Sequence, residues 1–109
     1  MRMEELSPAR QRLVRLFQTI NFGRLEELEI RGGDPVFSPA PRVFLELKLD
    51  VNDRPRPEAQ LERFELREQV QRLFRQIEDL GDGSVEVVEV RHGLPFRMVV
   101  EATPAEVAQ

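Results

Sequence analysis

The first apolar pattern along the chain has the spacing of a helix. Ser7 is a residue type that caps helices, and Pro8 suits the first helical position, where a missing N–H costs no hydrogen bond. The apolar face that follows contains Leu13, Val14, Leu16, Phe17 and Ile20. This spacing predicts a helix over residues 8–21, and Gly23 is expected to end it in a left-handed conformation.

Two alternating stretches follow this helix and predict a hairpin. The strands are expected over residues 25–31 and 42–50, with a tight turn at Gly32-Gly33. In the first strand the side chains expected on one face are Glu26, Leu28 and Ile30. In the second strand the side chains expected to face the core are Val43, Leu45, Leu47 and Leu49.

The second half of the chain repeats this order. Its apolar helical face contains Leu66, Val70, Leu73, Phe74 and Ile77. The pattern predicts a helix that starts between Pro57 and Phe64 and stops at Leu80-Gly81. Strands are then expected over residues 84–91 and 96–102, joined by a turn at His92-Gly93.

The two halves also resemble each other in sequence. Residues 15–20 match residues 72–77, and residues 29–35 match residues 89–95. The offset between matched residues drifts from 57 to 60, which predicts small insertions between helix and strand. Coincidence between two amphipathic helices would explain the apolar matches but not the shared Arg-x-Gly-x-Pro turn. We therefore expect an internal αββ repeat.

These elements predict one α+β domain over residues 1–109. Its repeated halves are residues 7–50 and 60–103, and residues 51–59 form a Pro-rich connector. A unit of about 50 residues is near the lower limit for an independent core, so the two units are expected to share one. The expected order α-β-β-α-β-β then gives a four-stranded antiparallel sheet with two helices on one face.

The strand and turn from Gly83 to Gly93 resemble the signature of the YezD-like family of small uncharacterised bacterial proteins. The matching residues are the Gly-Ser-Val-Glu opening at Gly83 and the His92-Gly93 turn, and residues 20–26 resemble the same opening. The sequence departs from the family pattern at Pro35 and Pro95, which follow the turns. The resemblance implies a small bacterial αββ unit, here present twice, with no assigned activity.

Composition excludes several kinds of site. The 109 residues carry a formal net charge of −4 and contain no Cys and a single His, His92. Disulfides, thiolate chemistry and Cys- or His-rich metal sites are therefore excluded, and no metal or cofactor is expected. No apolar run approaches the roughly 20 residues of a membrane span, and the first residues lack the apolar stretch of a signal peptide. A cytoplasmic protein without a membrane partner is the expectation.

The polar groups form no recognisable catalytic arrangement. No Ser lies in a Gly-x-Ser-x-Gly elbow, and His92 falls in a predicted turn. Glu26, Glu27 and Glu29 could offer oxygen ligands to Mg²⁺ or Ca²⁺, but alternate strand positions point to opposite faces. We expect no catalytic residue and a protein that is not an enzyme.

Arginine is the one residue type whose abundance suggests a partner. Fifteen of the sixteen basic residues are Arg, which suits bidentate phosphate contacts better than Lys does. The possible nucleic-acid patch consists of Arg10, Arg12, Arg15 and Arg24. A net charge of −4 opposes attraction to phosphate, so nucleic-acid binding is the alternative hypothesis.

The first hypothesis is a protein-interaction or self-association module, such as a homodimer. An exposed sheet face and open edge strands can accept a strand from a partner. The possible interaction face consists of Phe44, Glu46, Lys48, Arg97 and Val99. A third hypothesis, an enzyme or small-ligand binder, requires a concave and partly apolar cavity.

Overall fold

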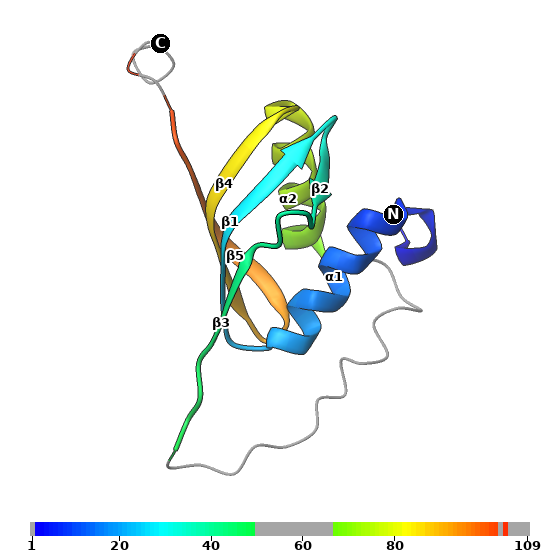
Figure 1. The fold of residues 1–109 in the computed structure, drawn as a ribbon. Coiled ribbons are helices and arrows are strands. Elements are labelled where there is room, and N and C mark those ends of the chain that lie inside the picture. The colour runs from blue at the N-terminus through cyan, green and yellow to red at the C-terminus, as the bar shows by residue number, and fades with distance from the viewer. Residues whose placement is uncertain (1, 50–66, 103, 105–109) are drawn as a thin grey trace.

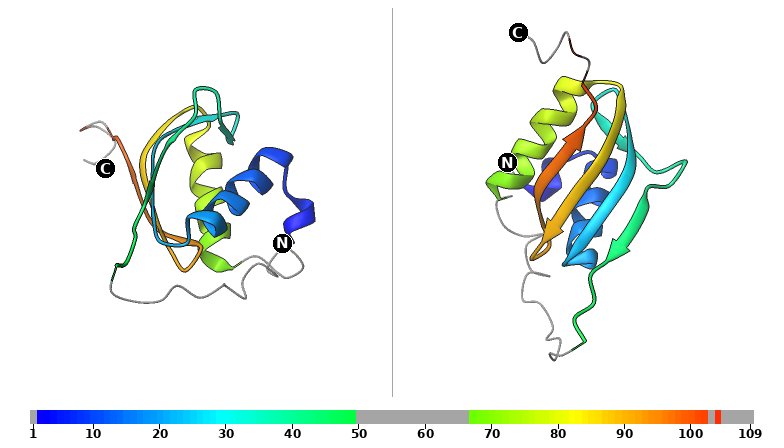
Figure 2. Two further views of the ribbon diagram at one scale, coloured as in Figure 1. Left: turned by 60° about the horizontal axis from the view of Figure 1, so that its bottom comes forward. Right: turned by 90° about the vertical axis from the view of Figure 1, so that its left-hand side faces the viewer.

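The computed structural model describes residues 2–49, 67–102 and 104, and it has the α+β architecture that the sequence predicts (Figure 1). The elements are a 3₁₀ turn, η1 (Met3–Glu5), then α1 (Pro8–Ile20), β1 (Gly23–Arg31), β2 (Asp34–Val36), β3 (Arg42–Leu45), α2 (Glu68–Leu80), β4 (Gly83–Arg91) and β5 (Leu94–Val100). All strand pairs are antiparallel, and both helices lie on the same face of the curved sheet (Figure 2).

Helix α1 begins where the sequence predicts and ends through a different residue. The Ser7 hydroxyl accepts a hydrogen bond from the Arg10 N–H at 3.2 Å, as an N-cap should. The left-handed residue at the other end is Asn21, with φ of 65°, and not Gly23. The Asn21 N–H donates the last helical hydrogen bond, to the Phe17 carbonyl, so two residues separate the end of the helix at Ile20 from β1, which begins at Gly23.

Helix α2 begins later than the pattern predicts. Arg67 has an extended backbone and stands at the N-cap, so this helix starts at Glu68 and not between Pro57 and Phe64. Its predicted stop is confirmed, because Gly81 is left-handed at φ 73° and donates to the Ile77 carbonyl. Leu66 and the connector at residues 51–59 lie outside the described residues.

The first strands of the two halves pair at the centre of the sheet. The order is β2-β1-β4-β5, and β3 also pairs with β1, so the sheet has five strands and not four. The extra strand arises because residues 37–41 interrupt the second strand of the first half, leaving β2 and β3 on either side of the break. Both predicted tight turns are present, with positive φ at Gly32 and Gly33 and at His92 and Gly93.

The alternation of β1 is broken at one residue. Glu27 has φ of 60°, so Leu25 and Leu28, three positions apart, both face the helices and are fully buried. The inward side chains of β1 are therefore Leu25, Leu28 and Ile30. The prediction that Glu26 shares a face with Leu28 and Ile30 is wrong. Val85 and Val88 are buried at the same spacing in β4.

The two halves are related by a constant offset. α2, β4 and β5 begin at Glu68, Gly83 and Leu94, each 60 residues after the first residue of α1, β1 and β2. The prediction that the offset between the halves changes from 57 to 60 residues is therefore wrong. The two helices are equivalent when their first and last residues are aligned, and not when their most similar sequence segments are aligned. β1 and β4 pair as Gly23 with Val90 and Ile30 with Gly83, so exchanging the halves reproduces the register.

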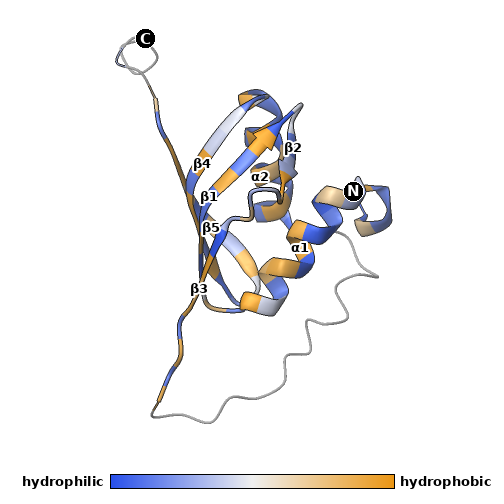
Figure 3. Cartoon of the chain, in the orientation of Figure 1, coloured by the Kyte–Doolittle hydropathy of each residue, from blue (hydrophilic) through white to orange (hydrophobic). Residues whose placement is uncertain are grey.

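One apolar core lies between the sheet and the helices. Phe17 and Phe74 are its largest side chains, and Met3 and Leu6, ahead of α1, are buried in it as well. The residues predicted to complete the core from β3 do not: Val43, Leu45, Leu47 and Leu49 are 45%, 56%, 71% and 96% exposed. The strand ends at Leu45, and the chain then runs away from the sheet (Figure 3).

Candidate interaction site

The large apolar side chains that are exposed in the described residues lie at the two edges of the sheet and just beyond β3. Within the part of the chain that the structure describes, the large apolar side chains that are exposed are Val43, Leu45, Leu47, Leu49, Phe96 and Val100. Four of them belong to β3 and the residues that follow it, and the other two belong to β5. An edge strand with unpaired backbone groups and apolar side chains is a surface on which another strand can pair.

We call residues 42–49 the open-edge segment. The Glu46 N–H donates to the Phe22 carbonyl at 2.8 Å, so the backbone of Glu46 faces β1. Phe44, two positions before Glu46, is paired with Arg24 of β1 in the same register. Antiparallel strands alternate between pairs that exchange hydrogen bonds and pairs that do not. The N–H and C=O groups of Leu45 therefore point away from β1, toward the free side of the segment.

The segment continues past the sheet that holds it. β1 begins at Gly23, the partner of Leu45, so Leu47 and Leu49 have no paired strand among the described residues. Figure 3 shows the alternation of hydrophilic and hydrophobic residues continuing along this extended stretch. The pattern is that of a strand with one apolar face, but no layer of the described molecule covers that face.

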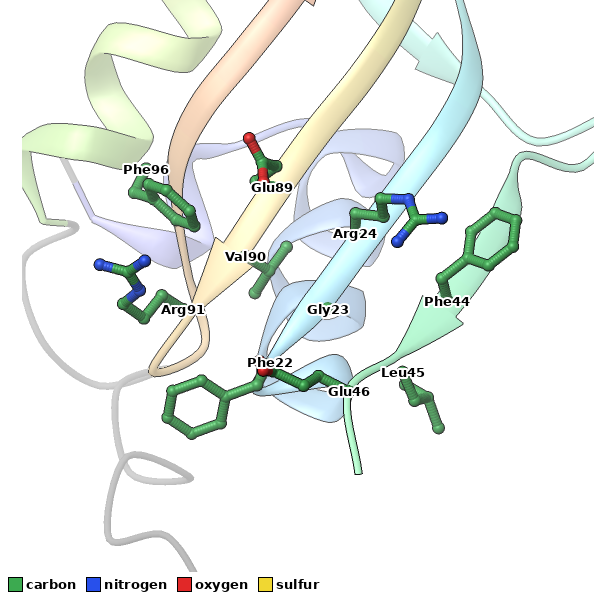
Figure 4. Close-up of a pocket in the computed structure, with 10 residues that line it drawn as sticks. All are labelled: Phe22, Gly23, Arg24, Phe44, Leu45, Glu46, Glu89, Val90, Arg91 and Phe96. Carbon is green, nitrogen blue, oxygen red and sulfur yellow. The ribbon is translucent and has the colours of Figure 1, made fainter. Parts of the chain in front are cut away.

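A hollow of about 440 Å³ lies on the outer face of the sheet beside this segment (Figure 4). Its floor is the paired backbone of Gly23 and Val90, and Phe22, Phe44 and Phe96 stand around it. A side chain at position 23 would close part of this space, because its Cβ would lie 2.0 Å from the Phe44 carbonyl oxygen.

Each of the three rings around the hollow is stacked under a cation of the same chain. Arg24 lies 4.2 Å from the Phe44 centroid, Arg91 lies 4.3 Å from that of Phe96, and Lys48 lies 5.1 Å from that of Phe22. Such pairs contribute about 0.5–1 kcal/mol each at exposed sites. The rings are thus occupied by internal contacts, which leaves less of their surface for a ligand.

The hollow offers little reaction chemistry. Its ten lining residues include no Ser, Thr or His, and of its two carboxylates Glu89 is ion-paired with Arg97. Elsewhere in the described residues, no group of three or more His, Asp or Glu side chains is placed to hold a metal ion. No helix of the described ranges is long and apolar enough to cross a membrane.

The structure does not bring the four arginines of the predicted nucleic-acid patch together on one surface. Arg10 is turned into the fold, where its guanidinium bonds Asp34 at 2.8 Å and the Gly33 carbonyl at 2.9 Å. Arg12 lies over the Phe37 ring, and Arg15 is exposed on α1. Arg24 stands on the outer face of the sheet, whereas α1 packs on the other face (Figure 4).

The predicted interaction face is likewise divided in two. Phe44, Glu46 and Lys48 lie together on the outward side of the open-edge segment. Arg97 and Val99 lie on β5, and β1 and β4 stand between the two groups. The sequence could not separate them, because it does not specify which strands meet at the centre.

A second groove accompanies β5. It has a volume of about 300 Å³ and lies against α2, with Leu73, Pro95, Phe96 and Met98 supplying its apolar lining. The sequence does not predict this groove.

The alternation of the last strand predicts Phe96, Met98 and Val100 as core residues, which is wrong for Phe96 and Val100, because both are exposed. The sequence signal for the exposure of Phe96 is its position after Pro95 at the start of a strand. A β-bulge lies there, and Phe96 is the extra residue between the pairs Glu89–Arg97 and Val90–Pro95.

The fold and the edge therefore define a small two-layer α+β protein with a partly apolar edge that pairs with no further strand of the described residues. No protein-family model, curated protein or solved structure matches the chain. The relation to the YezD-like family stays a prediction from two short segments.

Proposed function

We propose that the protein is a non-enzymatic association module whose binding element is the open-edge segment. One observation carries this proposal: apolar side chains at every second position remain exposed along β3 and the residues that follow it, and the backbone groups of Leu45 point outward. Pairing with a partner strand would satisfy those groups and cover the leucines.

The apolar surface is large enough to drive association. Leu45, Leu47 and Leu49 are each more than half exposed. Fully burying a leucine side chain contributes about 1.5–3 kcal/mol, and part of this is offset by the loss of freedom on association. Proteins usually protect such edges with charged or Pro residues, and residues 45–49 contain two such residues, Glu46 and Lys48.

The non-enzymatic part of the proposal is supported by the chemistry of the hollows. The larger one lacks a hydroxyl or imidazole side chain, and its cations are stacked on phenylalanine rings. The second is lined mainly by apolar side chains, amides and two arginines. Neither combines a nucleophile with a general base.

Amide hydrogen exchange at rising protein concentration tests the proposal. The amides of Leu45, Leu47 and Leu49 should exchange more slowly as the concentration rises, because an added strand would bond them. The amides of Phe44 and Glu46, which already face β1, should change little. Light scattering on the same samples should show a species larger than the monomer.

Two aspartate variants decide which edge is responsible. Leu47→Asp should remove both the larger species and the protection of the outward amides. Val100→Asp, at an exposed apolar position on β5, should leave both in place. A wild-type chain that stays monomeric with unprotected edge amides, or a larger species that survives Leu47→Asp, would refute the proposed function.

A further inference from the structure

We infer that the occupant of the open edge is a second copy of this chain, paired antiparallel about a two-fold axis that passes through Leu47. This inference rests on the proposed function of the open-edge segment and adds the identity and register of the partner. In this register Leu47 faces its own copy, Leu45 faces Leu49, and Glu46 faces Lys48.

The backbone restricts which registers can form. The outward hydrogen-bonding groups of β3 belong to Val43 and Leu45, since Glu46 bonds inward to Phe22. A partner that extends the strand past Glu46 would add the groups of Leu47 and Leu49, at every second position from Leu45. An antiparallel partner must therefore place odd-numbered residues opposite odd-numbered residues. A two-fold axis through Leu47 meets this condition and uses the outward groups of Leu45, Leu47 and Leu49 in both copies.

Charge distinguishes among the registers that remain. An axis through Glu46 places Glu46 opposite itself, and an axis through Lys48 does the same for Lys48. An axis through Leu45 sets Arg42 against Lys48. With the axis at Leu47, Glu46 of each copy lies opposite Lys48 of the other, which gives two opposite-charge pairs and no like-charge pair among the described residues.

Among pairs formed by the described residues, one competing register also brings opposite charges together. An axis through Phe44 would set Arg42 against Glu46, but it would place Leu47 opposite Pro41, which has no N–H to donate. The axis through Leu47 avoids the proline.

The same register also gathers the exposed apolar surface. Side chains directly opposite each other in an antiparallel pair lie on one face of the sheet. Leu45, Leu47 and Leu49 of both copies would therefore form one apolar cluster, and the charged pairs would lie on the other face. The three most exposed large apolar side chains of the described chain are those that this pairing covers.

Charge reversal at two exposed positions tests the register. Glu46→Lys and Lys48→Glu each turn both cross-strand pairs into like-charge pairs, so each variant should dimerise about tenfold more weakly than wild type. The double variant Glu46→Lys/Lys48→Glu should recover the wild-type affinity. An equimolar mixture of the two single variants should form heterodimers in preference to either homodimer.

The chain contains no cysteine, so a single introduced thiol reports the axis directly. Opposed residues have Cα atoms about 4.5–5.5 Å apart, which is within disulfide reach. Leu47→Cys should therefore form a covalent dimer rapidly on mild oxidation. Leu45→Cys is the matched control, because the two copies of residue 45 would be about 13 Å apart along the strands.

The outcomes separate this inference from the function on which it rests. If Leu47→Asp disrupts the dimer but neither single charge variant weakens it, the open edge binds and the register is wrong. Faster cross-linking of Leu45→Cys than of Leu47→Cys would overturn the register in the same way. A monomeric wild-type chain with unprotected edge amides would overturn both proposals.

Discussion

Arg10 connects three parts of the chain that are distant in sequence. Its side chain is only 15% exposed, bonds Asp34 and the Gly33 carbonyl, approaches Glu78 at 3.4 Å and lies over the Phe74 ring. Charge-assisted hydrogen bonds contribute about 1.5–3 kcal/mol, and Asp34 is exposed enough to recover water when the partner is removed. Arg10→Met should therefore lower the free energy of unfolding by about 1–3 kcal/mol.

The measurement is urea denaturation, with Arg15→Met as the control. Arg15 is exposed on the same helix, so the same substitution there should change stability by less than about 0.5 kcal/mol. Equal effects of the two substitutions would show that Arg10 contributes nothing specific. From the sequence, Arg10 is predicted to lie in an exposed basic patch. Its contacts with Gly33, Asp34 and Glu78 could not be predicted, because these residues are remote from Arg10 along the chain.

Glu27 is the second residue with a local constraint. It is exposed and has φ of 60°, a conformation that costs a residue other than glycine about 1–2 kcal/mol. Glu27→Gly should leave stability unchanged or raise it by up to about 1 kcal/mol. Glu27→Val should lower stability by about 1–2 kcal/mol, because a β-branched side chain fits this conformation poorly.

Glu29→Val is the control for this pair, since it places the same side chain in the same strand at a residue without positive φ. It should be neutral or slightly stabilising, because valine favours strands. The prediction fails if Val is tolerated equally at both positions in thermal or urea unfolding.

At the scale of elements, Gly23 decides whether β3 can join the sheet. An alanine Cβ there would lie 2.0 Å from the Phe44 carbonyl oxygen, a backbone atom that cannot move without moving β3. Gly83 is its counterpart 60 residues later and has nearly the same φ, 157° against 155°. Its closest neighbour would be the flexible end of Leu80, at 3.3 Å.

Because the two glycines share the backbone strain, their alanine variants isolate the contact with β3. Gly23→Ala should be about 2 kcal/mol more destabilising than Gly83→Ala, and it should also remove amide protection from Phe44 and Glu46. Chemical denaturation and hydrogen exchange measure the two effects. Similar stabilities with β3 still protected would contradict this explanation.

The elements themselves could be predicted where the signal is local. Ser7 caps α1 through a hydrogen bond three residues away, and Gly81 ends α2 through its own backbone conformation. The break between β2 and β3 could not be predicted, because it depends on how residues 37–41 leave the sheet. The predicted start of α2 is too early, because apolar spacing alone does not show at which residue the backbone becomes helical.

At the scale of the whole molecule, alternation identified the candidate segment but not its environment. Leu45, Leu47 and Leu49 alternate with charged residues, which shows that the strand has one apolar face. Whether another layer covers that face depends on the strand order, and β3 lies at an edge because β1 pairs with β4 on its other side. The same residues therefore change from predicted core to the proposed binding surface.

The proposed self-association through this surface would make stability depend on concentration. If only the folded chain pairs, each tenfold rise in total concentration stabilises the dimer by about 1.4 kcal/mol, shared between two chains. For a chain of this size the melting temperature should rise by about 3–5 °C per tenfold. Leu47→Asp should melt at one temperature throughout, equal to the wild-type value at high dilution, because Leu47 is 71% exposed and packs little within its own chain. A Leu47→Asp melting temperature well below that limit would mean that Leu47 stabilises the monomer, and the segment would then belong to the fold rather than to an interface.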